Sequence, residues 1–508
     1  MVVQKLARFL NSKRVRALWQ SDTGWHIIGL LPWPLKQYVK ATYRRILVVP
    51  TVLPTKVQTH VDSWNHNKPM LSVVIPCYNH GRYIRDTLRS LEMQTFRDFE
   101  TIVVDDGSNE ELTIRVLDDL RKEGIKVFRQ KKLNVATALN FGIRAARGRY
   151  ACCVAADDKL ESTYLEKCLC LLESNPGVAI AYSLVRTFGY ENRIWLTESF
   201  DLRLLLEYNY ICAAAVFRRS VWEQVGGFDE AIDGYEDWDF WLKAGKAGFR
   251  GRLIPEALFN YRRHGATLNI RSDRKYRELT EHIRKNHDDI YSYPERTKEI
   301  ENTYSDIRVP NPFVNLSLKI QYANLREPEG VIITSAEVAR LFGEKISGAA
   351  RQNELIKALF VTIDPESSRP SRNDLLGLST QFYHLRNFLD PYCHLDFLLN
   401  LMSTRSARLV VVWDSALAYE WISAIKSRSP VLVISVIGDR SEFVRLSAKW
   451  DQFIDVHVTL SEYAMRSLTH DFGVRSEKVR LISSVLSSDK AIELSKILTI
   501  YAKTQRTT

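Results

Sequence analysis

Three pairs of acidic residues in this 508-residue chain combine residue types and positions that suit chemistry on a charged substrate. They are Asp105-Asp106, Asp157-Asp158 and Glu236-Asp237. The first two pairs follow short apolar runs, and the third opens a helix-like segment. Open α/β sheets bind their ligands at the carboxyl ends of parallel strands. Adjacent aspartates at such an edge suit a hard divalent cation that also holds a diphosphate.

Alternating strand-like and helix-like segments must position these pairs. The expected strands are Leu71–Ile75, Glu100–Val104, Ile125–Arg129 and Tyr150–Ala155, and the expected helices are Tyr83–Gln94, Glu110–Glu123, Thr137–Ala146 and Ser162–Ser174. This alternation predicts an α/β domain with a mostly parallel, doubly wound sheet. Residues 179–265 indicate more antiparallel pairing, and residues 275–325 a polar helical connector.

A second α/β region begins near Gly330. Its expected strands are Val331–Thr334, Leu409–Trp413, Val431–Val436, His457–Thr459 and Val479–Ile482, and its expected helices include Ala349–Phe360 and Ala416–Lys426. A chain of this length holds two or three domains. We divide it into an arm and linker (1–68), a first α/β domain (69–270), a connector (271–327) and a Rossmann-like α/β domain (328–508).

The net charge of +11 is concentrated near the N-terminus, where residues 1–56 hold ten basic side chains and one acidic one. Residues 1–20 fit a basic amphipathic helix, and tryptophans at 25 and 33 follow it. Such a segment suits an anionic membrane surface through residues 1–50. An arm packed on the main domain or on a partner subunit fits equally well. The remaining chain is near neutral, which argues against nucleic acid as a partner.

Composition and short motifs exclude several other classes. No run of 18 apolar residues predicts a membrane-spanning helix. The seven cysteines are odd in number and form no paired CxxC sets, so we expect reduced core thiols in a cytosolic protein. Neither a Walker A sequence nor a strand followed by GxGxxG is present, which argues against triphosphate hydrolysis and dinucleotide redox chemistry.

Residues 69–270 resemble a family 2 glycosyltransferase with the GT-A fold. The matching motifs, in order, are Ser72-Val-Val-Ile-Pro-Cys-Tyr-Asn79, Val103-Val-Asp-Asp-Gly-Ser108, Ala155-Ala-Asp-Asp158, Val225-Gly-Gly-Phe-Asp229, Glu236-Asp237 and Tyr261-Arg-Arg-His264. Each motif alone is weak, but six in order over about 40% of the chain are specific. An ordinary acidic turn or a helix N-cap is the alternative interpretation of the aspartate pairs.

The resemblance implies a donor site. Tyr78 would lie against the nucleobase and Asp106 would accept its imide N–H, which suits uracil or thymine. Other residues implied in nucleotide-sugar binding are Pro76, Asn79, Asn140, Asp157 and Arg263. Asp158, Asp157 and His264 would hold Mn²⁺ or Mg²⁺, which stabilises the leaving diphosphate. Many family members have a further Asp where this chain has Ala155.

The resemblance also implies the catalytic group. Asp237 would be the base that deprotonates the acceptor hydroxyl in an inverting transfer, with Glu236 orienting it or binding acceptor. Gly227 and Trp238 would contact the acceptor. Phe240 and Trp241 have the spacing of core residues.

Residues 328–508 resemble the first half of a GT-B glycosyltransferase of family 4 type, on Ser347-Gly-Ala-Ala-Arg351 and Thr459-Leu-Ser-Glu462. This half would bind acceptor, recruit a partner glycosyltransferase or act as a scaffold.

These features predict a metal-dependent inverting transferase that moves a sugar from UDP or dTDP to a glycan or lipid-linked acceptor. It would act in surface polysaccharide or glycoconjugate synthesis, at the cytoplasmic face of the cell membrane. A catalytically silent nucleotide- or glycan-binding scaffold and a retaining transferase are the alternatives.

Overall fold

The computed structural model describes residues 68–195, 197–264, 275–298, 300, 330–334, 358–363, 382–389, 393–405 and 407–482. All of them belong to one compact unit, His66–Thr508. The predicted N-terminal arm and the Ser347–Arg351 motif lie outside the described residues. Among the described helices, none has the length and apolarity needed to cross a membrane.

The first sheet begins with four parallel strands in the order β3-β2-β1-β4 and continues through β8, β6, β9 and β5, with β7 beside β6. Its strands are β1 (Leu71–Cys77), β2 (Phe99–Asp105), β3 (Lys126–Arg129), β4 (Tyr150–Cys153), β5 (Lys159–Leu160), β6 (Ile180–Gly189), β7 (Ile194–Trp195), β8 (Val216–Arg218) and β9 (Gly251–Arg263). Parallel strands that are buried on both faces are mostly apolar, as the fully buried run Leu71–Ile75 is at every position except Ser72.

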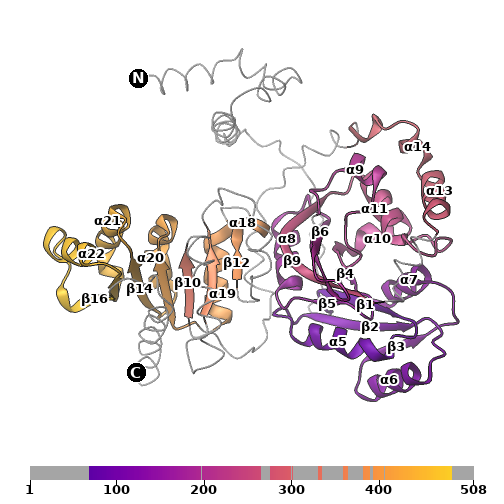
Figure 1. Ribbon diagram of the computed structural model, residues 1–508, viewed down its shortest axis with the longest axis horizontal. Helices are drawn as coiled ribbons and strands as arrows, with labels where there is room; N and C mark the ends of the chain where they lie inside the picture. Colours follow the sequence, from indigo (N-terminus) through magenta and orange to yellow (C-terminus); the bar gives the residue numbers. More distant parts are fainter. Residues whose placement is uncertain are drawn as a thin grey trace, which may run out of the picture. The chain divides into compact units, whose positions relative to one another are not determined.

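Helices cover both faces of the parallel part of this sheet (Figure 1). α5 packs against α6, whereas α7 packs on β1 and β2. The helices are α5 (Gly81–Glu92), α6 (Glu111–Lys122), α7 (Val135–Ala145), α8 (Tyr164–Ser174), α9 (Leu202–Glu207), α10 (Arg219–Val225), α11 (Glu236–Lys246), α13 (Tyr276–Asn286) and α14 (Asp288–Tyr291). Right-handed crossovers require this change of face where the strand order reverses at β1.

The second sheet is parallel at every described pairing, in the order β12-β11-β10-β13-β14-β15-β16. Its strands are β10 (Gly330–Thr334), β11 (Ala358–Thr362), β12 (Phe382–His384), β13 (Leu409–Trp413), β14 (Leu432–Ile437), β15 (Val456–Thr459) and β16 (Val479–Leu481), and its helices are α18 (Leu385–Phe388), α19 (His394–Thr404), α20 (Ala416–Arg428), α21 (Ser441–Lys449) and α22 (Glu462–Arg466). Numbered from β10, this order begins 3-2-1-4-5-6, the order of dinucleotide-binding Rossmann sheets.

Buried polar contacts join the two sheets. Glu166 on α8 accepts hydrogen bonds from Arg405 at 3.2 Å and from the Tyr383 hydroxyl at 3.1 Å. Lys167 forms a buried 2.5 Å ion pair with Glu256, and Asn387 donates to the same carboxylate at 3.1 Å. Because these groups are almost fully excluded from water, removing one partner would leave another buried and uncompensated.

The structure confirms the predicted α/β fold class with a second α/β sheet. One segment differs from the expectation: the helix predicted for Ala349–Phe360 ends in a strand, since Ala358–Thr362 pairs with β10. Short strands β5 and β12 were not expected either. All seven cysteines are buried and none forms a disulfide, as predicted.

Candidate active site

The carboxyl edge of β1, β2 and β4 gathers the predicted donor residues. β1 pairs in parallel with β2 on one side and with β4 on the other, so the strand order reverses there. Such a reversal opens a crevice beyond the carboxyl ends of the strands. The loops that leave this edge contain Tyr78–His80, Asp106 and Val154–Asp158. The sheet register therefore places three motifs that are distant in sequence at one edge.

Asp106 and Tyr78 lie together around the side chain of Lys132. The Lys132 ammonium group is 2.6 Å from Asp106 Oδ2 and 4.5 Å from the centre of the Tyr78 ring. Gln130 and the Leu133 backbone N–H donate to Asp106 Oδ1 at 2.8 and 2.9 Å. A nucleobase that stacks on Tyr78 and donates to Asp106 would share this carboxylate with Lys132 or displace it.

Asn79 links the first loop to the second. Its backbone has a φ of 55°, in the left-handed region that asparagine tolerates. Its side-chain oxygen accepts the N–H groups of Asn109 and Glu110, each at 3.0 Å. Pro76 lies within β1, in register with Val104. Both residues shape the edge that Tyr78 and Asp106 share.

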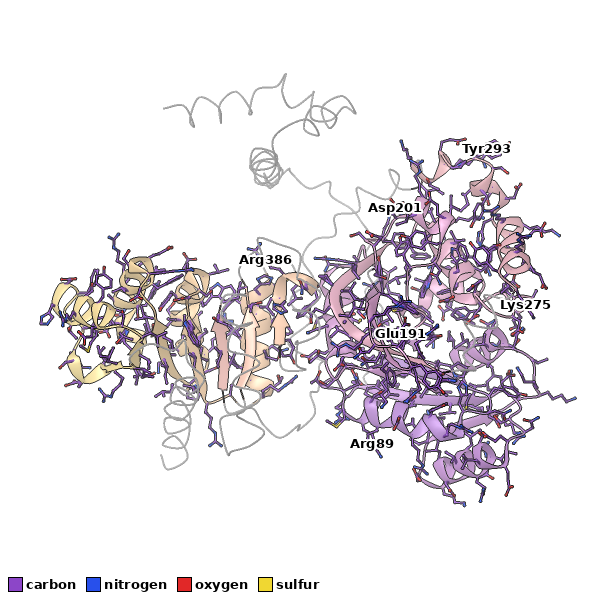
Figure 2. The ribbon with its side chains drawn as sticks, in the orientation of Figure 1. Arg89, Glu191, Asp201, Lys275, Tyr293 and Arg386 are labelled. Atoms are coloured by element: carbon purple, nitrogen blue, oxygen red, sulfur yellow. The ribbon has the colours of Figure 1, made fainter. Side chains whose placement is uncertain are left out.

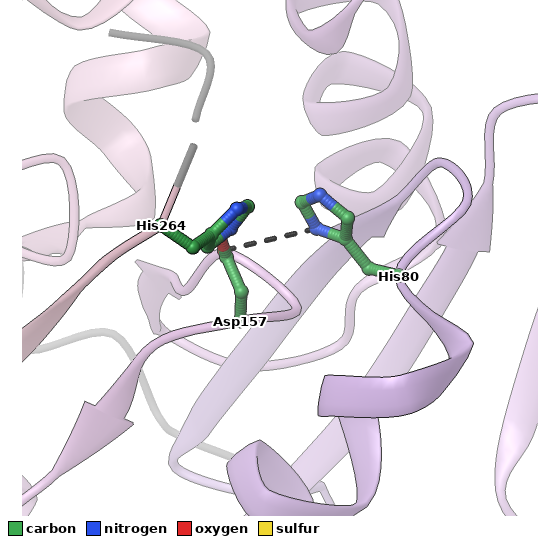
Figure 3. A group of neighbouring side chains, drawn as sticks. All are labelled: His80, Asp157 and His264. Atoms are coloured by element: carbon green, nitrogen blue, oxygen red, sulfur yellow. Dashed lines mark hydrogen bonds and ion pairs between the residues drawn. The ribbon is translucent and has the colours of Figure 1, made fainter. Parts of the chain in front are cut away.

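Asp157 lies between two histidines (Figure 3). His264 Nε2 is 2.9 Å from Asp157 Oδ2, and His80 Nδ1 is 3.8 Å from Asp157 Oδ1. One ligand atom from each residue lies within 4.8 Å of the other two. A carboxylate and two imidazoles are donors that divalent transition metals accept, so these residues fit a cation.

Asp158 occupies a different position, behind this cluster. Its Oδ1 accepts the Arg262 backbone N–H at 2.8 Å, and its carbonyl accepts the Thr87 hydroxyl at 2.7 Å. Burial, together with the charge of Asp157, raises the pKa of Asp158 well above its ordinary value. The described structure thus brings Asp157 and His264 together, while Asp158 braces the loop; its predicted ligation stays a prediction.

The two arginines before His264 point to different partners, because neighbouring residues of a strand face opposite sides. Arg262 donates to the Asp157 carbonyl at 2.7 Å and to Asp86 at 2.8 Å. Arg263 lies 3.6 Å from Glu191, which Figure 2 labels. Arg262 therefore contacts the aspartate loop directly, whereas Arg263 lies beside Glu191 and its nucleotide contact stays a prediction.

Asp237 and Glu236 begin helix α11. Asp237 Oδ2 accepts the Asn209 side-chain N–H at 3.1 Å, and Oδ1 accepts the Trp238 backbone N–H at 2.8 Å. Glu236 is buried, and its Oε2 accepts no hydrogen bond from the described residues. Tyr235, which precedes the helix, has a φ of 58° and turns the chain sharply into it.

The environment holds these two carboxyl groups at different pKa values. Burial, then the charge of Asp237, raises the pKa of Glu236 to about 8. Burial raises the pKa of Asp237 to about 6, against the opposing donors from Asn209 and Trp238. Because the two groups are adjacent and coupled, the first proton to leave belongs to the pair, and the hydrogen bonds from Asn209 and Trp238 favour its loss from Asp237.

The raised pKa values of two buried thiols indicate that the acidic groups lie near the ends of β1 and β4. Burial, then the charge of Glu236, raises the pKa of Cys153 at the end of β4. Burial raises the pKa of Cys77 at the end of β1, and the charges of Asp105 and Asp157 raise it further. Glu236 thus lies near the strand that leads to Asp157.

Trp238, which is predicted to contact the acceptor, packs inside the domain. It is buried, and its indole N–H donates to the Leu205 carbonyl at 2.6 Å. Its contact with the acceptor stays a prediction. Phe240 and Trp241 are core residues, as expected.

Asn140 organises the glycine turn after α10. Its amide donates to the Phe228 carbonyl and to Glu230, and its oxygen accepts the Trp222 indole N–H and the Phe228 N–H. These bonds use its full capacity of two donors and two lone pairs. Gly227, with a φ of 76°, lies so close that an added Cβ would meet Asn140 Oδ1 at 2.7 Å. Asn140 therefore positions the turn, and its nucleotide contact stays a prediction.

Sequence reasoning missed His80, Lys132 and Asn209. His80 follows the Pro-Cys-Tyr-Asn motif directly, which was its one available signal. Nothing in the spacing indicates its approach to Asp157, because the pairing of β1 with β4 produces that contact.

Comparisons with known proteins agree with this geometry. Residues 72–226 match the family model for glycosyl transferase family 2. Amylovoran biosynthesis glycosyltransferase AmsB of Erwinia amylovora is 31% identical over 207 residues, which cover 37% of this chain and 68% of that protein. Chondroitin synthase of Escherichia coli is 27% identical over 214 residues, and the match covers 40% of this chain but spans only 30% of that protein's length.

Among solved structures, residues 1–349 of S. aureus TarS in complex with UDP-GlcNAc align with a TM-score of 0.35 and 21% identity. The alignment covers 39% of this chain and 60% of that one. A TM-score this low carries no argument about ligands.

Proposed function

Because this chain belongs to glycosyl transferase family 2 and is a glycosyltransferase, we propose that it moves a sugar from a UDP- or dTDP-sugar to a hydroxyl of a glycan or lipid-linked acceptor. The relatives named for chondroitin and amylovoran favour polysaccharide synthesis as its setting. The observation that carries the proposal is the adjacent carboxyl groups of Glu236 and Asp237 at the start of α11, where Asn209 and Trp238 donate hydrogen bonds to Asp237.

On the donor side, Tyr78 and Asp106 would bind the base. The Asp106 carboxylate suits uracil or thymine because both carry an imide N–H, whereas cytosine has no such group. Asp157 with His264 would hold Mn²⁺ or Mg²⁺, which neutralises charge on the departing diphosphate. Lys132 would remain near the base as a second polar contact.

On the acceptor side, Asp237 would take the proton of the attacking hydroxyl. Hydrogen bonds from Asn209 and Trp238 oppose the effect of burial on its pKa and keep it more acidic than Glu236. A carboxylate base that acts opposite the leaving diphosphate inverts the anomeric centre in one step. Glu236, the weaker acid, can donate to the acceptor when it is protonated, or orient Asp237. A product that keeps the donor's anomeric configuration would instead indicate the retaining alternative.

We also propose that the protein acts at the cytoplasmic face of the cell membrane, through basic residues 1–50, and that residues 328–508 bind acceptor or a partner glycosyltransferase. The basic charge supports the first proposal. The Rossmann strand order of the second sheet supports the second.

The test is calorimetric titration with UDP, dTDP, GDP and CDP, with and without Mn²⁺. We expect metal-dependent binding of UDP or dTDP, lost in Asp157→Asn. It should be retained in Asp396→Asn, which alters a half-exposed aspartate of the second sheet's α19. Absence of binding by all four nucleotides would favour the silent scaffold.

A further inference from the structure

We propose that His80 supplies a second imidazole nitrogen to the cation, so that this site selects a transition metal such as Mn²⁺ over Mg²⁺. The inference rests on the proposed function, since it concerns the same donor site. It adds a residue and a selectivity to that site.

Geometry places His80 within reach of the cation. A cation with bonds of about 2.1 Å sets neighbouring ligands about 3.0 Å apart and opposite ligands about 4.2 Å apart. The separations of 2.9 Å for His264 and 3.8 Å for His80 from Asp157 lie close to this range, and no pair of ligand atoms exceeds 4.8 Å. Movement of the three ligand atoms by less than about 1 Å would bring all of them within bonding distance of one ion.

An aromatic frame holds the two imidazoles. Tyr83 on α5 stacks on His264 with ring centres 4.9 Å apart and an interplanar angle of 29°. His80 meets both rings edge-on, at 5.9 Å from Tyr83 and 5.8 Å from His264. The Arg262 guanidinium covers Tyr83 at 4.8 Å. These contacts restrict the rotamers of both histidines, which reduces the entropy lost when an ion binds.

The backbone of His80 fixes the origin of its side chain. Its carbonyl accepts the N–H groups of Tyr83 and Ile84 at 2.9 and 3.1 Å, which starts helix α5. The ring therefore projects toward Asp157 from the N-cap position of α5, as Figure 3 shows.

The ligand chemistry sets the selectivity. Mg²⁺ prefers oxygen ligands and keeps much of its water, whereas imidazole suits later first-row metals. The cluster of His80, Asp157 and His264 offers two nitrogens and one carboxylate, with diphosphate oxygens and water left to complete the shell. Affinity of such a mixed site rises along the series from Mn²⁺. Replacing His80 would leave one imidazole nitrogen, so oxygen atoms would make up most of the ligands around the cation.

The test is electron spin-echo spectroscopy of Mn²⁺ bound to the full-length protein in the presence of UDP. Directly bound ¹⁴N nuclei modulate the echo, and ¹⁵N-histidine labelling identifies them as imidazole. The variant is His80→Asn, since asparagine is a favourable N-cap that preserves the start of α5. The control is His282→Asn, which alters a partly exposed histidine beside Asp229, outside the cluster.

We expect two coupled imidazoles in the unmodified protein and in His282→Asn, and one in His80→Asn. Mn²⁺ affinity should fall about tenfold in His80→Asn, while Mg²⁺ competes better. One imidazole in the unmodified protein, or an unchanged echo and Mn²⁺/Mg²⁺ ratio in His80→Asn, overturns the role of His80 but leaves the proposed function intact. A spectrum without any protein nitrogen overturns the proposed metal dependence as well.

Discussion

Asp237→Asn and Glu236→Gln are expected to differ greatly in effect, although both replace a carboxyl group at the start of α11 with its amide. The two residues are adjacent on α11, and burial raises the pKa of Asp237 to about 6 and that of Glu236 to about 8. Asp237 is therefore the stronger acid of the pair, and Glu236 keeps its proton to higher pH. An amide removes the base at position 237 but imitates the protonated acid at position 236.

The magnitude follows from the role of each group. A positioned general base contributes about 10²- to 10⁴-fold to the rate. The loss of Asp237 should therefore raise the barrier by about 3–5 kcal/mol. Glu236→Gln should lower kcat less than about threefold near neutral pH, because the charge of the pair does not change. In the unmodified protein kcat should rise with pH through about 6, since the base must lose its proton, and then level off.

The assay measures initial rates of nucleotide release from the donor that calorimetry selects, across a range of pH. UDP affinity and the melting temperature serve as controls, and both should change little in either variant. If Asp237→Asn retains transfer within a few-fold of the unmodified protein, with an intact fold, the assignment of the base is refuted. Equal losses in both variants would refute the protonation assignment.

Three further predictions concern other parts of the chain. Asp106→Asn should weaken UDP binding about tenfold in calorimetry. The reason is that the neutral amide loses the ion pair with Lys132 and accepts the base N–H less strongly. Unchanged affinity would exclude Asp106 from base recognition. Arg405→Met should lower the free energy of unfolding, measured in urea, by about 3–5 kcal/mol. The substitution removes the charged partner of the fully buried Glu166. A decrease below about 1 kcal/mol would mean that this contact is weak. Deleting residues 1–50 should abolish sedimentation with anionic liposomes without altering UDP binding, and equal sedimentation of both forms would contradict the membrane proposal.

The sequence determined the elements of the first domain and the acidic residues at the carboxyl edge of its sheet. Leu71–Ile75 is apolar except at Ser72 because a central parallel strand is buried on both faces, so its pattern alone predicts it. Acidic residues that follow such strands must gather at one edge, which predicts Asp106 and Asp157 as neighbours. Apolar patterns are ambiguous where elements are short. Ala358–Thr362 is five residues long, and periodicity does not distinguish such a strand from a helix end.

Tertiary structure decided what each of these residues does. Asp157 and Asp158 are adjacent in sequence, yet one faces two histidines and the other binds the backbone of Arg262, because β9 returns beside their loop. The pKa values of Glu236 and Asp237 depend on burial and on donors from distant segments, which no local pattern contains. His80 meets Asp157 only through the register of β1 and β4. Sequence thus fixes which groups reach the edge, whereas packing fixes their protonation and partners, because both depend on atoms brought together from across the chain.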